Sequence, residues 1–308
     1  LLKAFSTWVQ DYDPDIFIGW NVINFDFRFL ANKYKQHRLP FNLGRNNSTG
    51  SWRNSNDGQQ HFITLPGRLV VDGIDSLKAA TYHFESFSLE AVSQELLGTG
   101  KKIEDVDNRA AAIQELFEHR PSALAEYNLQ DCRLVEQIFA KTKVMDYLIE
   151  RAYLTGLPLD KYGGSTASFD NLYLPLLHRS GYIAPDYNSG ATGLNAPGGY
   201  VMDSKPGLYK HVLVLDFKSL YPSIIRTFFI DPMGLAVGVA EYQKDGNADS
   251  LLEGFNQAQF SRTQHHLPGL IKTLWQARDV AKRENNAAVS QAIKIIMNSF
   301  YGVLGSPG

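Results

Sequence analysis

Three cations near the end of the chain are spaced for contact with phosphate groups. Arg278 and Lys282 are four residues apart and share one face of a predicted helix, and Lys294 lies on the next helix. An antiparallel turn near Ala287 would bring the three together. Residues 261–296 carry a net charge of +4, against −6 for the rest of the chain. Such a cluster suits a polyphosphate, because cations neutralise its oxygens and stabilise the charge that develops during phosphoryl transfer. The alternative is a basic face exposed to solvent.

One carboxylate stands at the end of the strongest strand pattern in the chain. Residues 212–215 are apolar on both faces, which predicts a strand in the centre of a sheet that ends at Asp216. Pro222 suits the first turn of a helix that begins near Tyr221. Asp216 therefore lies where ligands gather in α/β proteins, or it simply caps the helix.

The last predicted helix has two faces of different character. Its apolar stripe predicts a core face, formed by Ile293, Ile296, Met297, Phe300 and Leu304. The neighbouring face holds a cation, an amide and an aromatic ring at helical spacing, namely Lys294, Asn298 and Tyr301. These three types suit phosphate, sugar and base contacts, and the alternative for Tyr301 is core packing.

A second group of carboxylates lies in the first half of the chain. Asp26 falls in the first turn of a helix predicted to follow a strand at residues 16–18. Tyr127 and Asp131 are four residues apart on one face of another helix. Carboxylates from separate elements can hold Mg²⁺, and a tyrosine can help to position an attacking water. Asp72 follows a strand at residues 69–71, and we interpret it as structural.

The elements that must position these residues alternate between strand and helix in the first half. Beyond the two strands, the patterns predict helices at 25–37, at 89–97 with Ser88 and Gly98 as caps, and at 122–153. Residues 42–58 and 241–254 are predicted to be polar loops, and two helices joined at 285–288 follow residue 267.

Length and composition set broad limits. A chain of 308 residues with 44% hydrophobic and 20% charged residues fits about two globular domains. Cys132 is the only cysteine, so an intrachain disulfide is excluded. No apolar run approaches about 20 residues, no signal peptide is visible, and the net charge of −2 gives no sign of a nucleic-acid partner. The chain opens without methionine, and we expect it to be a fragment of a longer protein.

Two long motifs in the second half resemble those of family B DNA polymerases. DFKSLYPSII at residues 216–225 resembles the first polymerase motif, of pattern DxxSLYPSII. KIIMNSFYG at residues 294–302 matches KxxxNSxYG of the fingers at each fixed position, and Arg278 and Lys282 match the RxxxK pair before it. The closest resemblance within the family is to a bacterial member.

The first half resembles the 3′→5′ proofreading exonuclease of the same family. NVINFD at residues 21–26 resembles its second motif, and YNLQD at residues 127–131 resembles its third, YxxxD. GGYV at residues 198–201 resembles the linker before the polymerase part. The family usually has tyrosine where this chain has Ala196, which weakens the expected contact to template DNA.

The resemblance implies a multidomain α/β (α+β) fold. It places an RNase H-like exonuclease domain at residues 1–155, a connecting segment at 156–200, part of the palm sheet at 201–260 and the helical-hairpin fingers at 261–308. Two family motifs have no counterpart: DxE is expected before Leu1 and DTD after Gly308. We therefore expect this chain by itself to lack both activities.

The resemblance also implies residue roles. Asp216 and the Phe217 carbonyl would hold two Mg²⁺ ions for polymerisation, and Asp26 and Asp131 would hold metal for exonucleolysis, with Tyr127 beside the water. Tyr221 would lie beneath the sugar and exclude a ribose 2′-hydroxyl. Residues expected to contact the nucleotide are Phe217, Ser219, Leu220, Tyr221, Arg278, Lys282, Lys294, Asn298 and Tyr301. Residues expected to contact DNA are Asn21, Gly198, Gly199, Tyr200 and Gly302.

The implied partners are primer–template DNA and deoxynucleoside triphosphates, with a sliding clamp reached through the missing C-terminal part. We expect no membrane association and a bacterial cytoplasmic location at the nucleoid. The competing hypotheses are a non-catalytic DNA-binding relative and a metal-dependent nuclease built on residues 1–155 alone. The second would leave the nucleotide-contacting helices unexplained.

Overall fold

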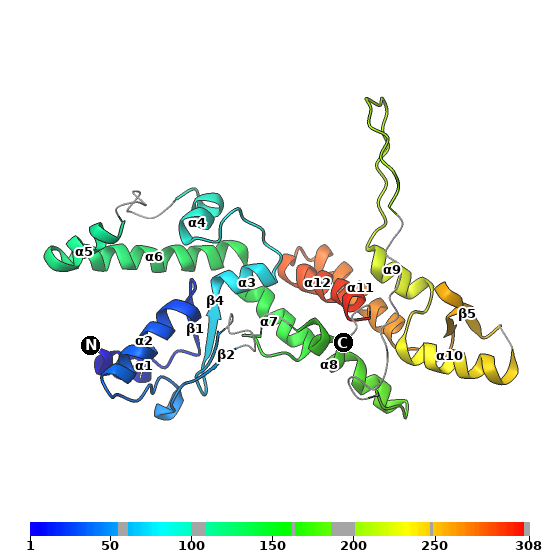
Figure 1. The fold of residues 1–308 in the computed structure, drawn as a ribbon, viewed down its shortest axis with the longest axis horizontal. Helices are drawn as coiled ribbons and strands as arrows, with labels where there is room; N and C mark the ends of the chain where they lie inside the picture. Colours follow the sequence, from blue (N-terminus) through cyan, green and yellow to red (C-terminus); the bar gives the residue numbers. More distant parts are fainter. Residues whose placement is uncertain (55–60, 100–108, 162–163, 186–200, 247–248, 305–308) are drawn as a thin grey trace. The chain divides into compact units, whose positions relative to one another are not determined.

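The computed structural model shows two compact units (Figure 1). It describes the chain except residues 55–60, 100–108, 162–163, 186–200, 247–248 and 305–308. The first unit comprises residues 1–153 and 158–163, and the second comprises residues 154–157 and 164–308. Each unit is described by itself below.

The first unit has two small sheets. Strands β1 (Ile16–Gly19) and β4 (Leu69–Asp72) run parallel, with Gly19 opposite Asp72. Strands β2 (Ser51–Asn54) and β3 (His61–Thr64) form an antiparallel hairpin. The strands predicted at 16–18 and 69–71 are confirmed, and β4 is the more buried of the two. Because β1 and β4 are parallel, both end at the same sheet edge.

Helices and helical turns make up most of the first unit. They are α1 (Leu2–Tyr12), the π turn η1 (Ile23–Phe27), α2 (Arg28–Gln36), the 3₁₀ turn η2 (Arg45–Asn47), α3 (Gly73–Ala79), α4 (Leu89–Leu97), α5 (Arg109–His119), α6 (Pro121–Thr142) and α7 (Val144–Thr155). The cap prediction for α4 is confirmed: the Ser88 hydroxyl accepts a hydrogen bond from the Ala91 amide at 3.2 Å, and Gly98 ends the helix with φ 68°.

Two sequence predictions for the first unit need correction. The helix predicted at 122–153 is two helices, because Lys143 between α6 and α7 adopts a left-handed conformation with φ 55°. The loop predicted at 42–58 contains strand β2. Most residues around Trp52 are polar, so the local sequence has no strand pattern. The strand forms because its backbone pairs with β3.

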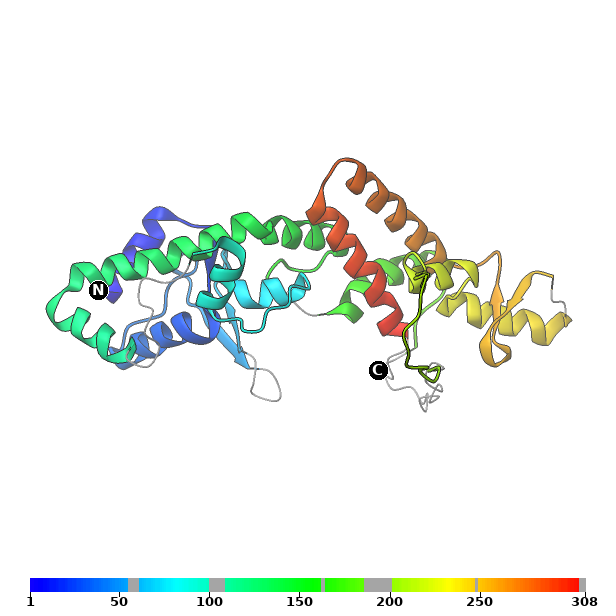
Figure 2. The same cartoon turned by 90° about the horizontal axis from the view of Figure 1, so that it is seen from above.

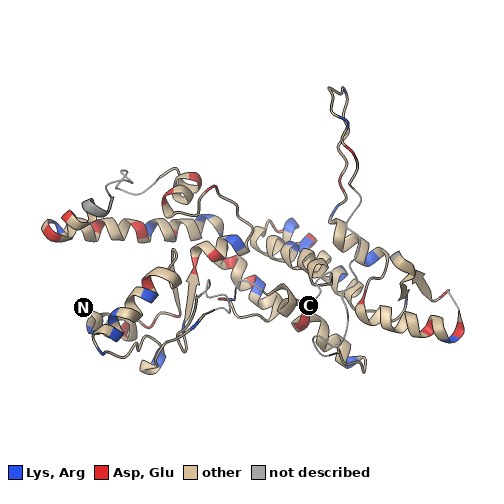
Figure 3. Ribbon diagram, viewed as in Figure 1, with Lys and Arg blue, Asp and Glu red and all other residues tan. Residues whose placement is uncertain are grey.

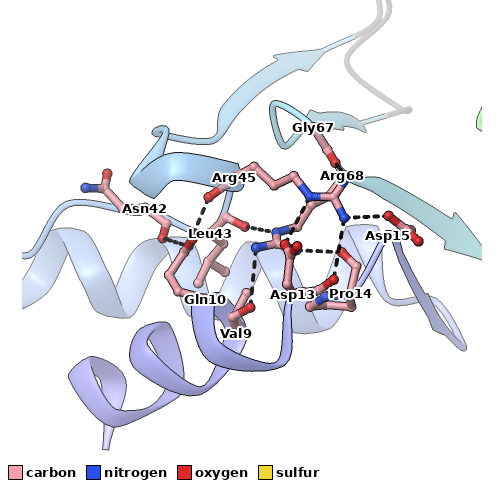
Figure 4. Close-up of polar contacts among 11 residues, drawn as sticks. Val9, Gln10, Asp13, Pro14, Asp15, Asn42, Leu43, Arg45, Gly67 and Arg68 are labelled. Atoms are coloured by element: carbon pink, nitrogen blue, oxygen red, sulfur yellow. Dashed lines mark hydrogen bonds and ion pairs between the residues drawn. The ribbon is translucent and has the colours of Figure 1, made fainter.

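A buried arginine ties the start of the first unit to its later loops (Figure 4). The Arg68 guanidinium donates to the Leu43 carbonyl at 3.0 Å, to the Val9 carbonyl at 3.3 Å and to the Asp13 carboxylate at 2.7 Å. Arg45 donates to the same Asp13 oxygen at 3.0 Å. Hydrogen bonding to Arg45 is the largest cause that lowers the pKa of Asp13, and Arg68 adds to it.

The second unit is mainly helical. Its elements are α8 (Ser165–Arg179), α9 (Leu220–Thr227), α10 (Pro232–Asp245), β5 (Leu251–Glu253), η3 (Phe255–Gln257), β6 (Gln259–Ser261), α11 (Leu267–Arg283) and α12 (Ala287–Leu304). The two helices predicted after residue 267 are confirmed as an antiparallel pair that lies side by side (Figure 2). The apolar stripe of α12 is buried in a core shared by α8, α9, α10 and α11.

A single carboxylate joins three elements of the second unit. Asp231 is almost fully buried and begins α10 by accepting from the Gly234 amide at 2.6 Å. It also accepts from the amides of His266 at 3.0 Å and Leu267 at 2.7 Å, at the start of α11. The Tyr173 hydroxyl of α8 donates to it at 3.0 Å. Burial and the Asp231 charge both raise the pKa of Tyr173, so this phenol stays protonated.

The strand predicted at residues 212–215 is absent from the structure. This segment is extended (Figure 1) and pairs with no strand among the described residues. Its apolar side chains are exposed. A strand needs a partner for its backbone hydrogen bonds, so an apolar pattern alone does not form a sheet. The palm sheet therefore does not form around Asp216 within the described part of this chain. The polar loop predicted at 241–254 is also wrong in part, because α10 continues to Asp245 and β5 follows.

Two stretches of the described chain are long and apolar enough to cross a membrane by length and composition. Residues 220–245 are, however, two helices with a break at residues 228–231. The other stretch, Ala287–Leu304, is α12, whose apolar stripe is buried in the core. Core helices of globular proteins have the same properties, so these stretches are weak support for a membrane location.

Candidate nucleotide and metal sites

The two polymerase-like motifs of the second unit meet through direct side-chain contacts. Arg278 Nη1 on α11 donates to Ser219 Oγ, at the start of α9, over 3.5 Å. The rings of Tyr221 on α9 and Tyr301 on α12 stack with centroids 3.9 Å apart and planes 14° apart. Helix α9 packs against both α11 and α12. Residues about 80 positions apart in the chain therefore form one corner.

Lys218 makes a second link between the same elements. Its ammonium lies 5.5 Å from the centre of the Trp275 ring and 3.9 Å from Asp279 Oδ1, both on α11. The Arg226 guanidinium, in the last turn of α9, lies 5.1 Å from the same ring. Two cations thus contact one indole, an arrangement that the ring quadrupole favours. Sequence analysis did not single out these residues.

Helix α12 presents the polar face that its sequence predicts. Lys294, Asn298 and Tyr301 are exposed while the apolar stripe beside them is buried. Lys282 on α11 is exposed and Arg278 is half-buried. The hairpin formed by α11 and α12 carries a group of Lys and Arg residues (Figure 3). Gly302 is also exposed, and a Cβ there would meet no atom within 4 Å.

Asp216 and Phe217 lie in the exposed segment before α9, and Leu220 begins that helix. The helix cap alternative for Asp216 is excluded, because Ser219 occupies the position before α9 in a left-handed conformation with φ 53° and no side chain caps the helix. Two residues, Phe217 and Lys218, separate Asp216 from Ser219 in this corner. The structure thus brings Ser219, Tyr221, Arg278 and Tyr301 together, while Asp216 projects into solvent.

The first unit brings its predicted carboxylates into one neighbourhood. Asp26 lies in η1, directly after β1, and Asp131 lies on α6, which packs against β1. Burial raises the pKa of the Cys132 thiol, and the charges of Asp131 and Asp26 raise it further. Both carboxylates therefore act on the same thiol. Tyr127, one turn before Asp131, is buried.

The backbone at the start of η1 has a special conformation. Asn21 has φ 57°, in the left-handed region that asparagine tolerates better than most residues, and its carbonyl accepts from the Phe25 amide at 3.0 Å. The chain turns there from β1 into the helix that carries Asp26. Burial raises the pKa of Asp26, which is the effect expected where neighbouring atoms displace water from a carboxylate.

The donor atoms of Asp26 and Asp131 fit a hard divalent cation. Carboxylate oxygens are the ligands that Mg²⁺ prefers, and these two carboxylates lie on separate elements and both act on the Cys132 thiol. Within the described ranges, no three His, Cys, Asp or Glu side chains gather closely enough to form a metal site. Gly198, Gly199 and Tyr200, predicted to contact DNA, lie outside the described residues.

Comparisons with known proteins agree with the division of the chain into an exonuclease-like unit and a polymerase-like unit. Residues 1–92 match the family model described as DNA polymerase family B, exonuclease domain, and residues 161–307 match the model of DNA polymerase family B. DNA polymerase II of Escherichia coli strain K12 is 52% identical over 99% of this chain. A DNA polymerase of Thermococcus sp. strain 9oN-7 is 28% identical over 99% of the chain.

The chain spans only 39% of the Escherichia coli protein and 40% of the Thermococcus protein. A solved structure of the family B DNA polymerase from Pyrobaculum calidifontis superposes with a TM-score of 0.74 at 22% identity, covering 99% of this chain and 41% of that one. This likeness supports the fold. Exonuclease domains and polymerases of this family are generally metal-dependent. On the two family models and the identity to DNA polymerase II together, the chain belongs to DNA polymerase family B.

Proposed function

We propose that the complete protein is a template-directed DNA polymerase with a 3′→5′ proofreading exonuclease, of the DNA polymerase II type. The observation that supports this most directly is the corner where Arg278 contacts Ser219 and Tyr221 stacks on Tyr301. These contacts join the polymerase motif at 216–225 to the fingers motif at 294–302. The alternative of a nuclease built on the first unit alone does not explain these contacts in the second unit.

In polymerisation, the cations of the α11–α12 hairpin grip the triphosphate of the incoming nucleotide. Arg278, Lys282 and Lys294 neutralise its oxygens, and Asn298 and Tyr301 line the new base pair. Tyr221 lies beneath the sugar, where its ring excludes a ribose 2′-hydroxyl by contact. The stack with Tyr301 keeps the Tyr221 ring in one orientation, which a steric test of the sugar requires.

Asp216 and the Phe217 carbonyl are the ligands that this chain offers to metal in the polymerase site. The family pattern adds a second carboxylate from a DTD motif. Two Mg²⁺ ions, when bound, stabilise the attacking primer 3′-oxygen and the leaving pyrophosphate oxygen. Asp216 is exposed, so its carboxylate is free to share a metal ion with a second carboxylate from outside the described chain.

In the exonuclease, Asp26 and Asp131 hold metal and Tyr127 helps to orient the water that attacks the terminal phosphodiester. Asn21 and Gly302 contact DNA in the first and second units, respectively, and Gly198, Gly199 and Tyr200 contact it from the linker. The domain limits are those predicted from the sequence: exonuclease at 1–155, connection at 156–200, palm at 201–260 and fingers at 261–308.

The proposed cofactor is Mg²⁺, two ions at each complete active site. The proposed partners are primer–template DNA and deoxynucleoside triphosphates, and a sliding clamp reached through the C-terminal part of the complete enzyme. A cytoplasmic location at the nucleoid follows from these partners and from the similarity to a bacterial DNA polymerase II.

Two carboxylate variants of the complete polymerase separate the two activities. Asp216→Ala should lose primer extension by on the order of 10³-fold, because metal-held charge contributes several kcal/mol, and should still degrade a 3′ end. Asp26→Ala should give the reverse pattern. Extension and degradation are measured on one labelled primer–template with and without dNTPs. Extension that survives in Asp216→Ala would refute the polymerase assignment, and wild-type protein without either activity would favour a non-catalytic relative.

The 308-residue chain alone should show neither activity above background. One palm carboxylate cannot hold two metal ions, and the exonuclease has two of its expected carboxylates. The same assay with purified chain, Mg²⁺ and dNTPs tests this. Clear extension that disappears in the chain with Asp216→Ala would contradict the expectation.

A further inference from the structure

A lysine outside the predicted nucleotide site joins the polymerase-like motif at residues 216–225 to helix α11. Lys218 lies in the turn that leads into α9. Its ammonium lies 3.9 Å from Asp279 Oδ1 and 5.5 Å from the centre of the Trp275 ring. Asp279 and Trp275 are four residues apart and therefore share one face of α11. Lys218 thus has an anionic and an aromatic partner on the same helix face.

The turn that contains Lys218 has a backbone conformation that needs support from outside. Ser219 has φ 53°, in the left-handed region that residues with a Cβ rarely adopt. Such conformations persist where surrounding contacts hold them. Arg278 Nη1 donates to Ser219 Oγ at 3.5 Å, and the Ser223 hydroxyl donates to the Lys218 carbonyl at 3.0 Å. Because Asp279 lies beside Lys218, two consecutive residues of α11 contact two consecutive residues of the turn.

The Trp275 ring extends this contact along α9 (Leu220–Thr227). The Arg226 guanidinium, in the last turn of α9, lies 5.1 Å from the centre of the same ring that Lys218 contacts. Lys218 comes just before α9, so the two cations flank the helix. Both are attracted by the ring quadrupole, and one indole of α11 therefore holds both ends of α9.

Asp279 carries a negative charge within a row of cations. It lies between Arg278 and Lys282 in the sequence, the two residues of α11 proposed to grip the triphosphate. An unpaired carboxylate there would repel the same phosphates. The Lys218 ammonium balances this charge. The pair therefore links α11 to the turn without weakening the attraction of the neighbouring cations for the nucleotide.

We infer that Lys218 is a positioning residue of the proposed polymerase site: by binding Asp279 and Trp275, it holds the start of the motif at 216–225 against α11. This inference rests on the proposed polymerase function. The incoming nucleotide needs the turn and α11 aligned, so a looser turn lowers the fraction of enzyme that is ready to bind it. Loss of the link should raise the KM for the nucleotide and change kcat little, because bound nucleotide restores the alignment.

The test uses the complete polymerase with Lys218→Met, which keeps a long side chain without the charge. Lys218 is exposed, so its replacement leaves the core intact. The KM for dCTP in primer extension should rise by about 10-fold, with kcat within about twofold of wild type. Lys218→Arg keeps a cation that can lie over the ring, and should keep the KM within about twofold of wild type.

Lys210→Met is the matched control, because it removes an exposed lysine of the same extended segment. It should keep the wild-type KM and kcat. Degradation of a 3′ end should be unchanged in every variant, since the exonuclease-like residues lie in the first unit.

A second substitution separates the pair from two independent charges. Asp279→Asn loses the link but leaves no unpaired carboxylate, so its KM should rise by only about threefold. The double variant Lys218→Met with Asp279→Asn should also stay near about threefold, which is a partial rescue of Lys218→Met. If Asp279 instead serves Lys282 on its own helix, the two effects would multiply to about 30-fold. Such a product would overturn the inference.

Hydrogen exchange of the complete polymerase without nucleotide gives a readout that does not depend on activity. In Lys218→Met, the peptide that covers residues 219–227 should lose protection, because the turn no longer holds the start of α9. Helix α12 should stay protected as in wild type. Unchanged protection of residues 219–227 would overturn the inference even if the KM rises.

Two kinetic outcomes in Lys218→Met would also overturn it. One is an unchanged KM, and the other is a lower kcat with unchanged KM, which indicates only that less protein is active. Failure of the proposed function itself looks different: Asp216→Ala would then still extend the primer.

Discussion

The two units hold their candidate site residues in different ways. In the first unit, the turn that carries Asp26 follows the paired strand β1, whose last residue lies opposite the buried Asp72 of β4. In the second unit, the segment that carries Asp216 is extended and exposed, and order begins only at Ser219, where α9 packs on α11 and α12. A strand places the residue at its end only when that strand has a partner.

The difference shows what each unit supplies by itself. The exonuclease-like unit positions two carboxylates from a sheet edge and a packed helix. The polymerase-like unit positions cations and rings from three helices, while its carboxylate Asp216 lies in an exposed segment outside any helix or strand. Helix packing alone is therefore sufficient to bring Ser219, Tyr221, Arg278 and Tyr301 together, whereas an unpaired segment leaves Asp216 exposed.

The largest expected effect tests whether helix packing organises the second unit. Asp231→Ala removes the acceptor of four hydrogen bonds and leaves buried donors on α8, α10 and α11 without a partner. The free energy of unfolding of this unit should fall by about 3–5 kcal/mol. Urea unfolding monitored by hydrogen exchange of α10 and α11 measures it. Asp245→Ala, at the exposed end of α10, should change it by less than about 0.5 kcal/mol.

The next effect probes the contact between α10 and β6. A Cβ on Gly238 would overlap the Gln259 carbonyl oxygen, so Gly238→Ala forces the strand away from the helix. The expected loss of stability is about 1–3 kcal/mol. Gly269→Ala on α11 is the control, because a Cβ there meets no atom within 4 Å. It should be neutral or stabilise by up to about 1 kcal/mol through helix propensity. Equal effects of the two changes would show that α10 and β6 are not in close contact.

A smaller effect is expected at the Trp275 contact. Trp275→Leu removes the ring that Lys218 and Arg226 share, and should cost about 1 kcal/mol of stability. The complete polymerase should also show a higher KM for dNTPs, because α9 and α11 lose a link that aligns the nucleotide corner. Lys272→Met on the exposed face of α11 serves as the control. If Trp275→Leu leaves both quantities unchanged, this link has no part in positioning α11.

The smallest effect concerns acid stability of the first unit. Hydrogen bonding to Arg45 lowers the pKa of Asp13, so the ionised carboxylate stabilises the folded state above pH 4 and this stabilisation is lost as the pH falls through the lowered pKa. Wild-type protein should therefore lose stability as the pH falls below about 4, the ordinary pKa of an aspartate. In Arg45→Ala this loss should be shallower. Denaturant midpoints across the acid range measure both slopes, and parallel slopes would contradict the assignment.

Local signals were sufficient to predict much of this structure. Ser88 and Gly98 predicted both ends of α4, and the alternation of apolar and polar residues predicted which face of α12 is buried. The pairing of α11 with α12 followed from the polar break between them. Each of these features depends on residues within a few helical turns.

Features that depend on distant partners could not be predicted in this way. The apolar residues 212–215 have a strong strand pattern. They form no strand, because no segment among the described residues pairs with them. The turn at Lys143 and the contact of Lys218 with Trp275 have no local signal.

The central claim is that Tyr221, held by Tyr301, contacts the sugar of an incoming nucleotide in the complete polymerase. The most direct measurement is single-turnover incorporation of dCTP and CTP opposite the same template base by wild type and Tyr221→Ala. The preference for dCTP should fall by about 100-fold in the variant, mainly through faster use of CTP, with dCTP incorporation nearly preserved. An unchanged preference in an active variant would contradict the placement of Tyr221 beneath the sugar.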